Sequence, residues 1–107
     1  MAFPRLLLPL LLSACSLTLP VVGQLADGSE TFTGTATGGL DGAGVLSITS
    51  SGGRTCTGSF VYVTERTGEG TFQCSDGQSG PFSFVTTGTR GTGTGTIGGK
   101  TMTFTFG

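Results

Sequence analysis

Three cysteines are the side chains in this sequence best suited to chemistry. Cys15 follows a leucine-rich run near the start, whereas Cys56 and Cys74 lie within the glycine-rich remainder. The chain contains no histidine, so a Ser-His or Cys-His nucleophile pair is impossible. Zinc would have only cysteine and carboxylate ligands. The sequence therefore predicts a protein that is not an enzyme and that holds no metal and no cofactor.

The acidic residues and one glycine-rich stretch could suggest catalysis or phosphate binding, but neither pattern supports it. Paired carboxylates can hydrolyse glycosides, but the acidic residues fall mostly in predicted turns, where acids are common because they are solvated; the candidates are Asp41, Glu65, Glu69 and Asp76. The stretch GTGTGTIGGK, residues 91–100, lacks the GxxxxGK[ST] spacing of a phosphate-binding loop. Its alternating glycines are typical of a strand.

The amino terminus has the features of a secretory signal. Arg5 precedes an apolar run over residues 6–12, and a bilayer-spanning helix would need about 20 apolar residues. The end of this run, Leu12-Ser13-Ala14-Cys15, resembles a bacterial lipobox. The resemblance implies that residues 1–14 are a lipoprotein signal peptide and that Cys15 is acylated as the first mature residue. An ordinary signal followed by a chance cysteine is the alternative.

Assigning Cys15 to a lipid has consequences for location and for the other two thiols. Ser16, rather than Asp, follows it, which by the Gram-negative sorting rule favours the outer membrane. Cys56 and Cys74 then remain, and in an oxidising compartment they should form a disulfide; two free thiols are the alternative. Without Arg5 the net charge of −1 becomes −2, and no basic patch indicates a nucleic-acid partner.

The chain beyond residue 14 divides into a tether and a repeat. Residues 15–26 contain Pro20 and Gly23 and show no clean period, which predicts a flexible tether. Residues 27–107 form one domain of three glycine-rich units and a half unit. The leading glycines of these units are Gly28, Gly53, Gly77 and Gly99, at steps of 25, 24 and 22 residues.

Each unit has the layout of a β-hairpin. The sequence predicts an all-β antiparallel meander of about seven strands, which forms either a curved open sheet or a small barrel. The expected strands cover residues 29–37, 43–50, 54–64, 69–75, 80–87, 90–97 and 100–106. No stretch after residue 14 is typical of a helix.

Pairing the strands within each unit tests the hairpin interpretation. A second hairpin centred on Glu65 places the two cysteines opposite each other, with aromatic rings across from glycines. Its opposed pairs are Cys56 with Cys74, Gly58 with Phe72, and Phe60 with Gly70. The other two hairpins are expected to pair Phe32 with Ile48, Gly34 with Leu46, Phe82 with Gly95, and Phe84 with Gly93.

Strand alternation then gives the sheet two different faces. One face is apolar and rich in glycine, so the sheet can curl toward it. We expect this face to form either a core or a binding surface around five of its aromatic residues, Phe60, Phe72, Phe82, Phe84 and Phe104. The other face carries threonine and serine, with four exceptions, Val45, Val61, Val63 and Val85.

The unit GGRTCTGSF followed by GEGTFQCSDG resembles the MORN repeat. Its glycine and aromatic positions correspond to Gly53, Cys56, Gly58 and Phe60. The third and last units keep part of the pattern, and the resemblance covers about residues 27–107. It implies a non-catalytic scaffold that contacts membranes or proteins. The chain also resembles small, uncharacterised bacterial lipoproteins of the same Gly/Thr/Phe type.

Together these patterns predict a lipid-anchored protein of the bacterial cell envelope with a structural or interaction role. It would attach to the membrane through Cys15, with an envelope protein or a lipid as a further partner. A β-barrel lipoprotein that binds a small molecule or a lipid is the alternative. The state of the apolar face separates the two, because a filled interior indicates a structural module and a cavity indicates ligand binding.

Overall fold

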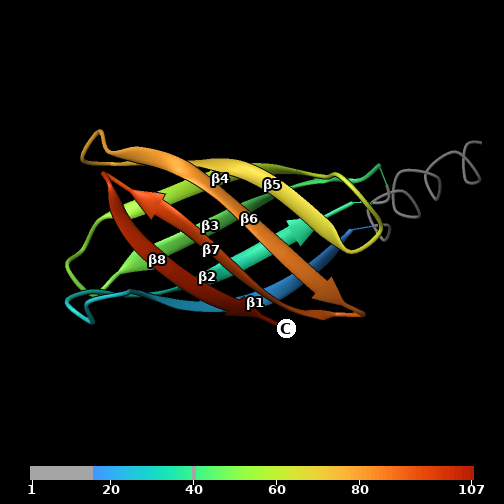
Figure 1. Cartoon of the computed structure of the whole chain (residues 1–107), viewed down its shortest axis with the longest axis horizontal. Coiled ribbons are helices and arrows are strands. Elements are labelled where there is room, and N and C mark those ends of the chain that lie inside the picture. The colour runs from blue at the N-terminus through green and yellow to red at the C-terminus, as the bar shows by residue number, and fades with distance from the viewer. Residues whose placement is uncertain (1–15, 40) are drawn as a thin grey trace, which may run out of the picture.

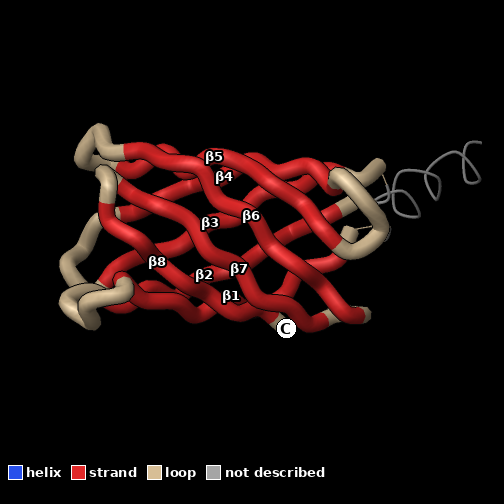
Figure 2. The backbone as a smooth tube through the Cα atoms, in the orientation of Figure 1, coloured by secondary structure: helices blue, strands red, loops and turns tan. Residues whose placement is uncertain are grey.

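The chain folds into a closed antiparallel barrel of eight strands that follow one another around the barrel in sequence order (Figures 1 and 2). The computed structural model describes residues 16–39 and 41–107. The strands are β1 Leu17–Leu25, β2 Thr31–Gly38, β3 Ala43–Ser50, β4 Thr55–Tyr62, β5 Thr67–Cys74, β6 Ser79–Thr87, β7 Arg90–Ile97 and β8 Lys100–Phe106. The predicted all-β meander is confirmed, and of its two forms the small barrel is the correct one.

The prediction of a tether over residues 15–26 is wrong for Leu17–Leu25, which form strand β1. Every second residue of this segment is apolar or glycine, and Val21 and Leu25 are buried. The outward-facing Pro20 and Val22 obscure the alternation in the sequence. Strand β1 pairs with β2 on one side and with β8 on the other, from Val21 opposite Phe106 to Leu25 opposite Met102. This eighth strand closes the sheet into a barrel.

The predicted registers are confirmed for the second and third hairpins and wrong for the first. Gly34 lies opposite Ile48, not opposite Leu46, so β3 is displaced by two residues. The connection between β2 and β3 decides this register. The Asp41 carboxylate accepts a hydrogen bond from the Ala43 amide at 3.1 Å, and Gly42 has a φ of 80°. A shift of two residues keeps each side chain on its predicted face.

The apolar face lines the barrel interior and the hydroxyl face points outward. All five predicted aromatics are buried within one core; its members are Val21, Leu25, Phe32, Leu46, Ile48, Cys56, Phe60, Phe72, Phe82, Phe84, Ile97, Met102 and Phe104. Glycines in the wall make room for these rings. A Cβ on Gly93 would collide with the ring of Phe104, which lies over the bare backbone of β7. The wall therefore curls around its aromatic side chains.

Gly34 offers a direct test of this close packing. A Cβ at Gly34 would collide with the backbone carbonyl of Ser47 on β3, whereas a Cβ at Gly38 of the same strand would lie 4.0 Å from the nearest atom of Phe60. We expect Gly34→Ala to lower the free energy of unfolding by about 2 kcal/mol. Gly38→Ala should change it by less than about 0.5 kcal/mol. Urea denaturation of both variants measures the difference, and equal effects would contradict the packing described here.

Candidate functional site

The two ends of the barrel are built differently. At one end, the capped end, the strands are joined by residues 26–30, 51–54, 75–78 and 98–99. At the other, the open end, lie the start of β1 and the connections β2–β3, β4–β5 and β6–β7. In Figure 1 the capped end lies at the left and the open end at the right.

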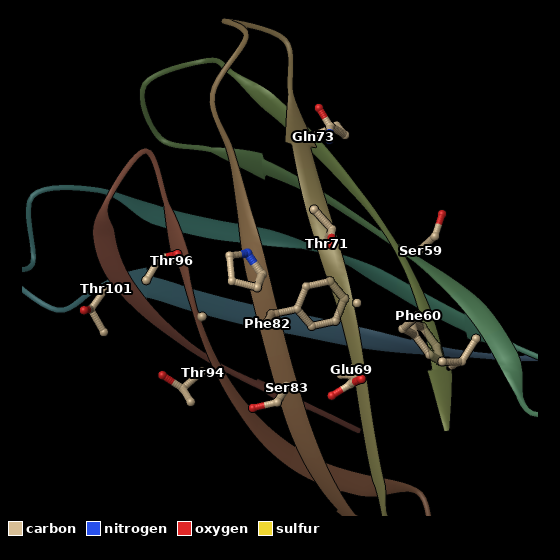
Figure 3. A pocket seen from close by; sticks show the side chains of 14 residues that line it. Ser59, Phe60, Glu69, Thr71, Gln73, Phe82, Ser83, Thr94, Thr96 and Thr101 are labelled. Atoms are coloured by element: carbon tan, nitrogen blue, oxygen red, sulfur yellow. The ribbon is translucent and has the colours of Figure 1, made fainter. Parts of the chain in front are cut away.

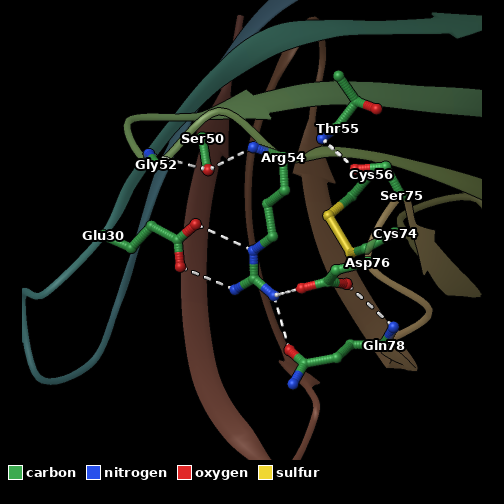
Figure 4. The surroundings of a disulfide bond; sticks show 10 residues. All are labelled: Glu30, Ser50, Gly52, Arg54, Thr55, Cys56, Cys74, Ser75, Asp76 and Gln78. Atoms are coloured by element: carbon green, nitrogen blue, oxygen red, sulfur yellow. Dashed lines mark hydrogen bonds and ion pairs between the residues drawn. A yellow bond between two sulfur atoms is a disulfide. The ribbon is translucent and has the colours of Figure 1, made fainter.

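Arg54 closes the capped end (Figure 4). Its guanidinium donates to both carboxylate oxygens of Glu30, at 2.9 and 2.8 Å, and to Asp76 and Gln78, at 3.1 and 2.7 Å. The same group lies 5.7 Å from the ring centroid of Phe32, the aromatic residue below it in the core. Arg54 therefore joins the turns that precede β2, β4 and β6 and covers the apolar interior.

Sequence reasoning missed this cluster, although the repeat contained a signal for it. Glu30, Arg54 and Gln78 each stand directly before a strand, and each is separated from the next by one hairpin. Aligning the units on these positions would have placed the three polar side chains together. The Ser50 hydroxyl completes the cap by accepting hydrogen bonds from the amides of Gly52 and Arg54, at 3.1 and 3.2 Å.

The cap stabilises the ionised forms of its carboxylates. A hydrogen bond with Ser50, followed by the interactions with Arg54, lowers the pKa of Glu30. A hydrogen bond from the Gln78 amide, followed by those from Arg54, lowers the pKa of Asp76. The carboxylates in turn raise the pKa of Arg54. The cluster is thus a structural ion-pair network.

The predicted disulfide between Cys56 and Cys74 is confirmed and lies next to the cap. It joins β4 to β5 at a directly opposed pair, and Cys56 is fully buried. The two cysteines are 18 residues apart in the sequence. Closing a loop of that length in the unfolded chain contributes on the order of 3 kcal/mol to the stability of the fold. The disulfide therefore reinforces the capped end.

The open end contains a cavity of about 560 Å³ inside the barrel. Inward side chains form its wall and three turns form its rim. Its lining residues are Leu17, Leu19, Ala36, Gly38, Gly39, Gly42, Leu46, Phe60, Tyr62, Glu65, Arg66, Phe84, Thr86, Gly88, Thr89, Phe104 and Phe106. The interior is thus filled at the capped half and hollow at the open half.

Aromatic rings form two groups along the barrel axis. Phe72 and Phe82 lie in the filled half and both contact Phe104, which reaches the cavity, with centroids 4.4 to 6.3 Å apart. Phe60 and Phe84 stand edge to face at 5.2 Å around the cavity, and Tyr62 and Phe106 meet Phe84 at 5.3 and 5.7 Å. Tyr62 is 39% exposed, which marks it as part of the mouth.

Polar groups are confined to the mouth of the cavity. Thr86 is buried, and its hydroxyl lies 3.0 Å from the carbonyl of Gly88 and 3.1 Å from that of Arg90. The hydroxyl therefore donates its hydrogen bond to the backbone of the barrel wall and not to a molecule in the cavity. Glu65 and Arg66 are exposed on the β4–β5 turn. A molecule in the cavity would therefore meet carbon surface at depth and opposite charges only at the rim.

The structure divides the predicted site residues between these regions. Phe60, Phe84 and Phe104 line the cavity, whereas Phe72 and Phe82 belong to the filled half. Sequence reasoning missed the contributions of Tyr62, Phe106 and β1. Tyr62 and Phe106 share the alternation of the apolar face, so the period contained the signal, but the position of the cavity did not follow from it. Cys15 lies outside the described residues.

A second hollow lies on the outer surface of the barrel (Figure 3). It is larger, about 1030 Å³, but it is shallow and crosses five strands. Its labelled polar side chains are Ser59, Glu69, Thr71, Gln73, Ser83, Thr94, Thr96 and Thr101. Such hydroxyl groups on an open surface remain hydrated, so we regard the cavity inside the barrel as the better ligand site.

Residues 16–39 and 41–107 contain no group of three or more His, Cys, Asp or Glu side chains that could hold a metal ion. Within the same ranges, no helix is long and apolar enough to cross a membrane.

Comparison with solved structures supports the barrel architecture. The chain is similar to a redesigned beta barrel, mFAP1, bound to DFHBI, with a TM-score of 0.65 and 20% identity over 83% of this chain and 90% of that one. It is also similar to a de novo designed fluorescence-activating beta barrel, with a TM-score of 0.64 and 18% identity over 83% and 88% of the two chains. At these identities the likeness shows the fold alone. No family model and no curated protein matches the chain, so the resemblance to the MORN repeat stays a prediction.

The ion-pair network predicts a stability that depends on acid pH. Because folding lowers the pKa values of Glu30 and Asp76, their contribution is complete above the unfolded values and is lost as the pH falls through the folded ones. We expect the free energy of unfolding to be level at neutral pH and to fall below about pH 4. Thermal denaturation at a series of pH values between about 2 and 7 measures this profile.

Arg54→Met should lower stability at pH 7 by about 2 kcal/mol and flatten the acid profile, because the partly buried Glu30 loses its charged partner. Arg90→Met is the matched control, since Arg90 is exposed at the open end and carries the same charge. If Arg90→Met reproduced the effect, net charge rather than the cap would be its cause.

Proposed function

We propose that this protein binds a small, largely apolar molecule in the cavity at the open end of the barrel. One observation carries the proposal: the barrel interior is packed at the capped end and hollow at the other. A purely structural barrel could fill its whole interior with side chains. Here Ala36 and Gly38 stand on the wall beside Phe60 and Phe84, and the space between them is left free.

The size and chemistry of the cavity define the class of ligand. Its volume, about 560 Å³, lies within the range of about 300–1,000 Å³ usual for small-molecule sites. The edge-to-face rings favour a flat or aromatic apolar body, since such rings prefer offset or perpendicular contacts. Glu65 and Arg66 at the rim would contact a polar end. The designed barrel of the same fold that holds the small molecule DFHBI supports the proposal.

We place this binding function in a non-catalytic lipoprotein of the bacterial cell envelope, whose role is to capture the ligand. The support is the lipobox-like sequence that ends at Cys15, together with a disulfide that oxidising compartments allow. The serine at position 16 favours the outer membrane.

Filling the cavity should abolish binding. We expect Ala36→Phe, whose side chain would occupy the space beside Leu46, to weaken the binding of N-phenyl-1-naphthylamine by at least about tenfold, which is about 1.4 kcal/mol. Tyr62 is the sole tyrosine and lies at the mouth, so energy transfer from Tyr62 to this apolar dye reports binding at the site.

The matched control is Thr35→Phe, one residue earlier on β2, where the side chain is exposed on the outer wall. It should bind the dye like the unsubstituted chain. Equal loss in both variants, with both thermal transitions intact, would show that the dye binds elsewhere and would overturn the proposal.

The lipid anchor has its own test, which is the intact mass of the protein from membrane and soluble fractions. We expect a membrane-bound species that begins at diacylated Cys15 and gains two hydrogens, about 2 Da, on reduction of one disulfide. A soluble species without lipid would contradict the lipobox interpretation and leave cavity binding untouched.

A further inference from the structure

Of the five exposed valines among the described residues, four lie at the open end of the barrel, and the fifth, Val22, lies toward the capped end of β1. Val45, Val61, Val63 and Val85 break the hydroxyl pattern of the outer face, and between 49% and 61% of each is exposed. Val45 and Val85 lie two residues from the open ends of β3 and β6, Val61 lies one residue from the end of β4, and Val63 follows that strand. We name these four residues the valine collar.

The rim of the barrel continues this apolar surface. Leu17 and Tyr62 line the mouth and are 51% and 39% exposed. Tyrosine is favoured where one side of a ring meets apolar surroundings and its hydroxyl meets water. The collar residues of β3, β4 and β6 lie within two residues of the open ends of these strands, or about 7 Å, which matches the depth of about 5–10 Å to which apolar faces enter a lipid interface.

The chain enters the barrel at this same rim. Leu17 begins β1 and lies opposite Gly38, next to the β2–β3 connection. Cys15 precedes it by two residues, which span at most about 7 Å. Because β1 replaces the expected tether, an acylated Cys15 would hold the mouth of the barrel against the bilayer rather than at a distance from it.

We propose that the open end is a membrane-docking face, on which the valine collar and the rim lie in the lipid interface. The cavity then opens toward the bilayer, so its ligand is an apolar molecule dissolved in the membrane. This ligand class rests on the proposed cavity binding, whereas the docking rests on the collar, the rim and the proposed acylation of Cys15.

The distribution of charge agrees with this orientation. Glu30, Arg54 and Asp76 form the ion-pair network at the capped end, which faces away from the membrane. At the turns of the open end the charges balance, because the exposed Asp41 and Glu65 are matched by the exposed Arg66 and Arg90. Such a balance fits the layer of zwitterionic headgroups without favouring strongly anionic lipids.

A tryptophan placed at the collar tests the docking. The chain has no tryptophan, so Val63→Trp supplies a single reporter at the open end. The full chain, recovered with its native modification state, is mixed with phosphatidylethanolamine and phosphatidylglycerol vesicles whose acyl chains are brominated, and the vesicle-bound fraction is isolated by flotation. We expect blue-shifted tryptophan emission that the brominated lipids quench.

The matched control is Thr101→Trp, an exposed strand position next to the capped end. It should remain unquenched on the same vesicles. Equal quenching at the two positions, no quenching at Val63→Trp, or no protein floating with the vesicles would overturn the docking proposal. A second pair, Val61→Asp and Thr101→Asp, each combined with Val63→Trp, supports the proposal if only Val61→Asp reduces the quenching while both keep their thermal transitions, and contradicts it if the two leave the quenching equal.

These outcomes are separable from a failure of the binding function. Val63 and Thr101 do not line the cavity, and energy transfer from Tyr62 to the dye is measured on the unsubstituted chain without vesicles. If the dye binds and the brominated lipids do not quench Val63→Trp, the binding function stands and the docking proposal is wrong. If the brominated lipids quench Val63→Trp and the dye does not bind, the docking stands and the binding function is wrong.

Discussion

The structure depends on the fit of large rings against bare backbone inside a narrow barrel. Phe104 lies over Gly93, and Phe82 and Phe84 cover glycines on the neighbouring strands in the same way. A ring on one strand therefore requires a missing side chain on the next. This complementarity lets eight strands close around an aromatic core in a chain with few large aliphatic residues, and it explains why 21 glycines are compatible with a folded wall.

The two ends of the barrel follow from how this core is distributed. Near the cap, Phe32, Phe72 and Ile48 are nearly inaccessible to solvent, and Arg54 covers them with a hydrogen-bonded network. Toward the mouth, small residues such as Ala36 and Gly38 replace the large ones and leave a cavity. Stability is thus concentrated at one end, where the disulfide also lies, and the other end is free to open. Ligand-binding regions are commonly drawn from such less stable parts of a fold.

Strand β1 links the architecture to the proposed membrane contact. By pairing with β8 it removes the sheet edges, and by beginning at Leu17 it brings the chain to the mouth of the barrel. This placement puts the valine collar at the same end as the start of β1, where the proposed anchor would hold it against the membrane. In the sequence the four valines are only exceptions on a polar face, whereas in the barrel they lie on or just after β3, β4 and β6 at the end where the chain begins its first strand.

The sequence by itself determined the all-β class, the faces of the strands, the cysteine pair and the registers of two hairpins, because each depends on alternation and spacing within a few neighbouring residues. It failed at β1, where Pro20 and Val22 mask the period, and in the first hairpin, where the Asp41 turn sets the register. Closure, the meeting of Glu30, Arg54 and Asp76, and the cavity were decided only by the tertiary structure. Each of these needs contacts between strands from different hairpins, and the alternation and spacing within one hairpin do not specify such contacts.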